Sequence, residues 1–191
     1  MTTASSATHR GHHQPAPDPW IVSWLERLAA GSRVLDFACG SGRHARAAAA
    51  LGLEVVAVDH DAEALAAVGT GVHVVHAELE VAPWPFAAAS FDAVIVSNYL
   101  FRSRLDLLCG LIRPTGVLLY QTFALGNEAF GRPRNPDFLL RPGELLEVAG
   151  RNGLHVLAYE DGIVGSPPRA RIQRMVACRP PLRLEALPLG S

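Results

Sequence analysis

The sequence predicts one α/β domain built around a mostly parallel sheet. Strand-like and helix-like runs alternate from residue 18 to residue 123, and the strand-like runs are almost continuously apolar, as in sheets covered on both faces. The chain has 191 residues, 49% of them hydrophobic, which suits a single core. We expect the domain to span 18–180, between a disordered tail at 1–17 and a flexible tail at 181–191.

An amphipathic helix opens the domain. Asp18 is a good N-cap and Pro19 suits the first helical turn, where its missing N–H costs nothing. Apolar residues then recur on one helical face until Gly31, which predicts the end of this helix. Beyond it, the pattern predicts strands at 33–38, 54–59 and 72–77, and helices at about 42–51 and 61–68.

The second half of the chain continues the alternation and then departs from it. We expect a strand at 91–97, a helix containing Leu105, Leu108 and Ile112, a strand at 116–123 and a helix at 142–152. The runs "LHVLAYED" and "ARIQRMVAC" follow, joined by "GIVGSPPR". This connection is too short for a helical crossover and natural for an antiparallel pair. The sequence therefore predicts seven strands, the last of them reversed.

Composition excludes several functional classes. The 17 basic residues, all arginine, nearly balance the 18 acidic residues, so no strong field attracts nucleic acid or an anionic membrane. No stretch reaches the ~20 apolar residues of a membrane span. Three widely spaced cysteines without C-x-x-C argue against disulfides or zinc and favour a cytoplasmic location. The histidines of the N-terminal tail lack acidic or cysteine partners, so we predict no metal site.

A carboxylate interrupts the first predicted strand, in "VLDFACGSGRHA". Asp36 precedes Gly40 and Gly42, which allow a tight turn and a close approach to a ligand at the following helix. The loop also satisfies the dinucleotide fingerprint G-x-G-x-x-A. A carboxylate beside it would repel a pyrophosphate but attract the ammonium of S-adenosylmethionine. The alternative is that Asp36 merely caps the loop.

This stretch resembles motif I of class I S-adenosylmethionine-dependent methyltransferases, D/E-x-G-x-G-x-G, with Ala38 in place of the first glycine. The resemblance implies a three-layer Rossmann-like fold with a seven-stranded sheet in the order 3-2-1-4-5-7-6 and an antiparallel last strand. It also implies that Asp36 binds the methionyl ammonium, directly or through water. Ala38, Gly40 and Gly42 would then lie beneath the cofactor.

A second acid, Asp59, ends the strand "LEVVAVD". A carboxylate at this place in the fold can accept hydrogen bonds from both ribose hydroxyls. The alternative is that Asp59 caps the next helix, although Asp61 suits that cap better. His60 either packs on the adenine or is a solvated loop residue.

Further candidates follow the third and fourth strands. The resemblance implies that Glu78 accepts the adenine amino group and that Leu79 lines the base, whereas Glu80 reads as a solvated charge. Asn98 and Tyr99 lie just past the fourth strand, where this family reaches the methyl group, although Tyr99 could simply pack on the next helix. The Asn/Asp-Pro-Pro-aromatic motif of amine-methylating enzymes is absent, which argues against adenine or amide acceptors.

The long loop at 124–141 is the candidate substrate region, because such loops are usually functional or disordered. Its "GNEAFGRPRNPDFLLRPGEL" resembles a group of small bacterial methyltransferases related to the tellurite-resistance protein TehB. Its polar residues could line an acceptor pocket, or they could make turns and meet solvent. These candidates are Asn127, Glu128, Arg132, Arg134 and Asn135.

The sequence therefore predicts a methyltransferase that moves a methyl group to a small molecule, either an oxyanion or a hydrophobic metabolite, by in-line displacement. His44, Tyr99 and Glu128 are the candidates for removing a proton, if the acceptor needs it. Two alternatives stay open: a methyltransferase acting on tRNA or protein, and a non-catalytic domain that binds S-adenosylmethionine. The neutral net charge argues against nucleic acid. We expect a monomer or a homodimer.

Overall fold

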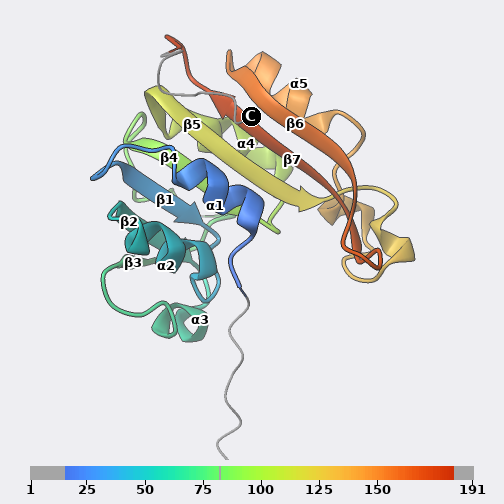
Figure 1. Cartoon of the computed structure of the whole chain (residues 1–191), viewed down its shortest axis with the longest axis horizontal. Helices are drawn as coiled ribbons and strands as arrows, with labels where there is room; N and C mark the ends of the chain where they lie inside the picture. Colours follow the sequence, from blue (N-terminus) through green and yellow to red (C-terminus); the bar gives the residue numbers. More distant parts are fainter. Residues whose placement is uncertain (1–15, 82, 183–191) are drawn as a thin grey trace, which may run out of the picture.

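A computed structural model of the chain, describing residues 16–81 and 83–182, has a seven-stranded sheet at its centre (Figure 1). The strand order is β3-β2-β1-β4-β5-β7-β6. Strand β7 pairs antiparallel with β5 and β6, and the other pairs are parallel. The predicted fold class and strand order are confirmed. The strands are β1 Arg33–Phe37, β2 Glu54–Asp59, β3 His73–His76, β4 Phe91–Ser97, β5 Ile112–Phe123, β6 His155–Val164 and β7 Ala170–Cys178.

Helices cover both faces of the sheet and make three layers (Figure 1). Successive residues of a strand point to opposite faces, so Val34 and Leu35 of β1 belong to two separate buried clusters. The Val34 cluster includes residues of α1, α2 and α3, and the Leu35 cluster includes residues of α4 and α5. The helices are α1 Pro19–Leu25, α2 Arg43–Ala50, α3 Ala62–Ala66, α4 Leu105–Gly110 and α5 Glu144–Arg151.

Several element boundaries differ from the prediction. Helix α4 stops at Gly110, and Ile112 instead begins β5 opposite Phe91, because Pro114 prevents the helix from continuing. Helix α1 ends at Leu25, and a hydrogen bond from the Leu28 amide to the Leu25 carbonyl tightens the chain beyond it. Strand β6 continues through Val164, so part of the expected connector belongs to the sheet.

The start of α1 is tied to the carboxyl edge of the sheet through Asp18. Its carboxylate accepts a hydrogen bond from the Trp20 amide at 2.9 Å, which confirms the predicted N-cap. The other carboxylate oxygen accepts from the Gln121 amide group at 2.9 Å, and the Asp18 amide donates to Nε2 of His44 at 3.1 Å. The predicted tails at 1–17 and 181–191, with the tail histidines, fall mostly outside the described residues.

The strand order places the ligand-binding edge of the sheet. Strand β1 lies between β2 and β4, so connections from β1 and β4 leave toward opposite sides of the sheet. A crevice forms at such a switch point, outside the carboxyl ends of the strands. The glycine loop after β1 and the residues after β4 therefore meet there. None of the described helices is both long and apolar enough to cross a membrane.

Candidate functional site

The glycine loop after β1 turns through left-handed backbone. Ala38, Gly40 and Gly42 have φ values of 55°, 54° and 74°. Ala38 therefore adopts a conformation that costs an L-residue about 1–2 kcal/mol and that glycine adopts freely. A Cβ atom on Gly40 would meet no other atom within 4 Å, so the open side of the loop faces the cleft. The loop can thus support a ligand at close range.

Gly42 has a different role, because its surroundings are closed. A Cβ atom there would lie 2.9 Å from both γ-carbons of the buried Val68. We expect Gly42→Ala to lower the free energy of unfolding by about 2 kcal/mol, from left-handed strain and this clash. Urea denaturation would measure the change. Gly52→Ala is the matched control, since its φ is 77° but no atom lies nearby; equal losses in both variants would contradict the role of Val68.

Asp36 is buried directly behind the loop and does not line the cleft. Its carboxylate accepts a hydrogen bond from the Ala45 amide of α2 at 2.8 Å. Burial raises the pKa of Asp36 from 3.8 to about 7, although the Ala45 hydrogen bond and the nearby Arg43 oppose the shift. The structure thus contains the capping contact that the sequence left as an alternative, with a partly ionised carboxyl group at neutral pH.

Asp59 holds the loop and lines the cleft. Its carboxylate accepts hydrogen bonds from the Gly40 amide at 2.7 Å and the Asp61 amide at 3.0 Å, and lies 3.1 Å from Nδ1 of His60. Asp61 caps α3, because its carboxylate accepts from the Glu63 and Ala64 amides, as the sequence suggested. Asp59 therefore does not cap α3. Its hydrogen bond with Gly40 links the end of β2 to the loop after β1.

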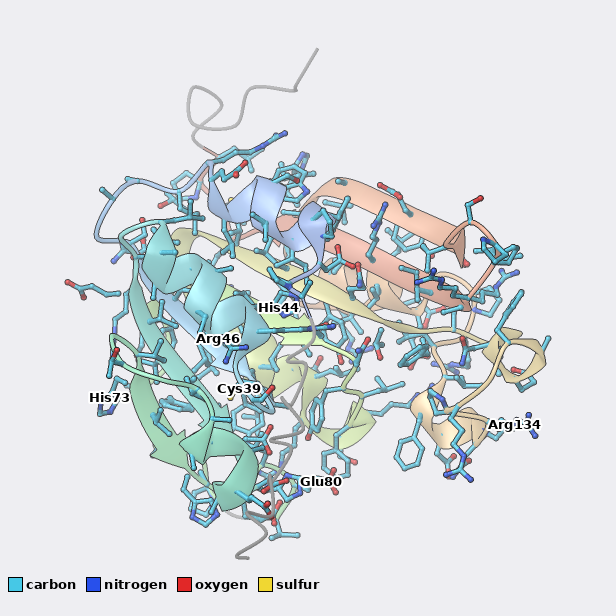
Figure 2. All side chains as sticks on the ribbon, turned by 60° about the horizontal axis from the view of Figure 1, so that its bottom comes forward. Cys39, His44, Arg46, His73, Glu80 and Arg134 are labelled. Atoms are coloured by element: carbon cyan, nitrogen blue, oxygen red, sulfur yellow. The ribbon has the colours of Figure 1, made fainter. Side chains whose placement is uncertain are left out.

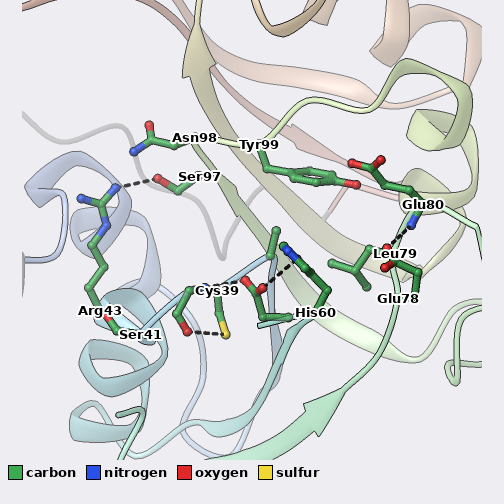
Figure 3. Close-up of a pocket in the computed structure, with 13 residues that line it drawn as sticks. Cys39, Ser41, Arg43, His60, Glu78, Leu79, Glu80, Ser97, Asn98 and Tyr99 are labelled. Atoms are coloured by element: carbon green, nitrogen blue, oxygen red, sulfur yellow. Dashed lines mark hydrogen bonds and ion pairs between the residues drawn. The ribbon is translucent and has the colours of Figure 1, made fainter. Parts of the chain in front are cut away.

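The other wall of the cleft comes from the segment after β3 and from the end of β4 with the residues that follow it (Figure 3). Leu79 is buried and forms an apolar surface between the exposed Glu78 and Glu80. The Glu80 amide donates to the Glu78 carboxylate at 3.2 Å. Asn98, with a φ of 57°, and Tyr99 follow β4. The cleft has a volume of about 560 Å³.

Arg43 is a cleft residue that the sequence analysis missed. It is the first residue of α2, and its guanidinium donates to the Ser97 hydroxyl at 2.9 Å across the cleft. A cation at a helix N-terminus is disfavoured by the helix dipole, and that conflict was the available signal. Cys39, Ser41, Glu80 and Ser97 also line the cleft without having been predicted as site residues.

The structure brings most of the predicted cofactor residues into one cleft. Gly42 and Asp36 do not line it. His44 is also buried away from the cleft, and burial, with a contribution from Arg43, lowers the pKa of its ring to about 4. The predicted residues that line the cleft are Ala38, Gly40, Asp59, His60, Glu78, Leu79, Asn98 and Tyr99.

The polar residues of loop 124–141 do not meet at the cleft. Asn127 is buried; its side chain donates to the Pro133 carbonyl at 3.2 Å and accepts from the Arg171 amide at 3.1 Å. The Glu128 carboxylate accepts a hydrogen bond from the Gly126 amide. The side-chain amide oxygen of Asn135 accepts from the Asp137 amide and caps a short 3₁₀ helix. The side chains of these three residues are therefore engaged in local structure.

The arginines of the loop lie farther out. Arg132, with Arg134 and Asn135, lines a separate shallow cavity of about 450 Å³. Arg134 lies at the outer end of the loop, away from Glu80 (Figure 2). The described residues contain no group of three or more His, Cys, Asp or Glu side chains arranged to hold a metal ion.

Comparison with known proteins identifies the fold. Residues 34–111 match the family described as "Methyltransferase domain". TehB from Haemophilus influenzae aligns with a TM-score of 0.70 at 17% identity, over 88% of this chain and 64% of that one. An S-adenosylmethionine-dependent methyltransferase from Mesorhizobium loti aligns with a TM-score of 0.67 at 19% identity, over 83% and 96%. These matches confirm the class I methyltransferase fold.

A curated relative covers less of the molecule. The ribosomal protein L11 methyltransferase of Bordetella parapertussis is 38% identical over 104 residues. That alignment includes 51% of this chain and 34% of the relative. The chain thus spans about a third of the length of the curated relative that it matches.

Proposed function

We propose, from the premise that this chain has the class I methyltransferase fold, that it is an S-adenosylmethionine-dependent methyltransferase acting on a small molecule. The observation that carries the proposal is one cleft with acids from successive strand ends, Asp59 and Glu78, beside an open glycine loop. A phosphate-free nucleoside with positive charges suits this lining, whereas the pyrophosphate of a dinucleotide would meet the carboxylates.

Several residues in and behind the cleft have a role in this proposal. Asp59 accepts hydrogen bonds from the ribose hydroxyls, Glu78 accepts from the adenine amino group, and Leu79 supports the base. Arg43, held by Ser97, binds the methionyl carboxylate through its planar guanidinium. The buried Asp36 favours the ammonium electrostatically through the loop.

The bound cofactor supplies a methyl group already activated on a sulfonium. The protein then has to align the acceptor with that methyl group and keep water out. Asn98 and Tyr99 suit this task, because they line both the cofactor cleft and a neighbouring cavity. His44 does not suit proton removal, because its Nε2 already accepts a hydrogen bond from the Asp18 amide.

The test of the function is acceptor-dependent turnover. The full chain would be incubated with methyl-labelled S-adenosylmethionine and a metabolite extract, and S-adenosylhomocysteine would be measured. We expect its formation to depend on the small-molecule fraction of the extract. Cofactor binding without turnover in any fraction would instead support a non-catalytic binding domain.

A protein acceptor is the second candidate function, and the similarity to a ribosomal protein L11 methyltransferase favours it. The same assay with ribosomal proteins in place of the extract separates the two. Label that enters protein alone would replace the small-molecule proposal.

Cofactor affinity should depend on pH through Asp36. Its pKa is about 7 without ligand, and a cationic ligand favours the ionised carboxylate, so binding releases a proton and tightens as pH rises. We expect the association constant to increase roughly tenfold from about pH 5.5 to about pH 7, below the range where free α-amino groups titrate. Calorimetry across this range measures the slope.

Asp36→Asn is the matched variant, because it keeps the shape and removes the titration. We expect weaker binding with a nearly flat pH dependence. A wild-type slope in this variant would assign the titration to another group. Without ligand, the stability of the protein depends on pH in the opposite direction. The pKa of Asp36 in the folded state lies above the ordinary 3.8, so its contribution to the free energy of unfolding falls as pH rises from 3.8 to about 7.

A further inference from the structure

A second cavity of about 310 Å³ adjoins the cofactor cleft. The two share Glu80, Asn98 and Tyr99, so a group bound in the second cavity lies beside the place from which a methyl group would come. The volume is at the lower end of the roughly 300–1,000 Å³ of small-molecule sites. A ligand of one or two rings therefore fits better than a macromolecular side chain with its backbone.

The lining of this second cavity is mainly apolar. Leu100, Phe123, Pro133 and Phe138 contribute apolar surface from β5, from loop 124–141 and from the chain after β4. The aromatic rings favour a flat apolar ligand, because they offer stacking and edge contacts at little entropic cost. Anions are disfavoured, since none of the arginines in the described part of the chain lines this cavity. Arg132 and Arg134 line the shallow cavity beyond Phe138.

Glu80 is the charged residue of the second cavity. It lines the cofactor cleft, the second cavity and a groove beside Trp84, so it stands where the three meet. Its carboxylate lies near the hydroxyl end of Tyr99 (Figure 3). Burial raises the pKa of Tyr99 above its ordinary range, so this hydroxyl keeps its proton, and among the described residues it has no hydrogen-bond partner. The hydroxyl oxygen itself is buried, so an unpaired donor lies close to the Glu80 carboxylate where the cleft and the second cavity meet.

We propose, on the basis of the proposed function, that the acceptor is an uncharged, flat, hydroxylated molecule and that Glu80 is its proton acceptor. The acceptor oxygen forms a bond to the methyl carbon while the bond from that carbon to sulfur breaks. The electron pair of the broken bond stays on sulfur. The hydroxyl proton passes to the Glu80 carboxylate. Tyr99 donates a hydrogen bond to a heteroatom of the acceptor, and the apolar wall positions its ring.

Binding of size-matched probes tests the acceptor class. The full chain, saturated with S-adenosylhomocysteine, would be titrated calorimetrically with 2-naphthol, with 2-naphthoate and with selenite. We expect 2-naphthol to bind at least about tenfold more tightly than 2-naphthoate, and selenite to give no signal. Equal or tighter binding of either anion, or no binding of 2-naphthol, overturns the inference. Failure of S-adenosylhomocysteine to bind overturns the proposed function instead.

Turnover tests the role of Glu80. We expect label from methyl-labelled S-adenosylmethionine to enter 2-naphthol, and Glu80→Gln to reduce this rate about a hundredfold. Binding of S-adenosylhomocysteine and of 2-naphthol should change less than about twofold. Glu54→Gln, an exposed carboxylate at the opposite end of the sheet, should keep the full rate. No methylation of bound 2-naphthol, or an undiminished rate in Glu80→Gln, contradicts the proposal.

Discussion

Asp59→Ala is expected to weaken S-adenosylmethionine binding at least about a hundredfold. The substitution removes the proposed acceptor for two ribose hydroxyls, and hydrogen bonds to a charged group are worth about 1.5–3 kcal/mol each. It also leaves the Gly40 amide, now 2.7 Å from the Asp59 carboxylate, without its partner. Isothermal calorimetry with S-adenosylhomocysteine measures the loss.

Asp61→Ala is the matched control for Asp59→Ala. Asp61 is two residues away, and its carboxylate caps α3 without lining the cleft. Its loss should lower the free energy of unfolding by about 1 kcal/mol and leave the cofactor affinity within about twofold. Equal affinities in the two variants would show that Asp59 is not a ribose ligand.

Arg102→Met is expected to lower the free energy of unfolding by about 3 kcal/mol, because it breaks an ion pair with a buried partner. The Arg102 guanidinium donates to the Glu144 carboxylate at 2.7 Å and 3.0 Å. Burial alone would raise the pKa of Glu144, yet hydrogen bonds from Arg102 and the Arg141 amide hold it below its ordinary range. Without Arg102, the carboxylate of Glu144 keeps, among the described residues, the contacts from Arg141.

Arg102 also anchors loop 124–141, because it donates to the carbonyl oxygens of Asp137 and Leu139 at 2.6 Å and 2.7 Å. We therefore expect faster amide hydrogen exchange in that loop in Arg102→Met. Arg151→Met is the control: Arg151 pairs with Asp106, but both side chains are exposed, so less than about 1 kcal/mol should be lost. Similar losses of stability in the two variants would refute the structural role of Arg102.

The parts of the site that are local in sequence were predictable. A glycine pair after an apolar run and an acid at the end of the next run can be read from a few residues. The parallel sheet then brings these strand ends together, so Asp59, Glu78 and Asn98 share one cleft. The N-cap roles of Asp18 and Asp61 were predictable for the same reason.

Other features depend on partners that are distant in sequence. Asn127 binds the Arg171 amide, 44 residues away, which no local pattern of the loop indicates. Glu80 follows a short strand in a stretch without periodicity. It is exposed, as expected of a solvated charge, but its place between the cleft and the second cavity depends on the fold. Phe123 lies at the end of a regular strand. Its place beside Phe138 and Pro133 arises because loop 124–141 folds back over the strand end, which the local sequence does not indicate.

The central claim is that the cleft binds a phosphate-free, positively charged nucleoside. Calorimetric titration of the full chain with S-adenosylmethionine and, separately, with NAD tests it most directly. The acids around the glycine loop predict one-to-one binding of S-adenosylmethionine and no detectable binding of NAD. Binding of NAD, or no heat with S-adenosylmethionine, would contradict it.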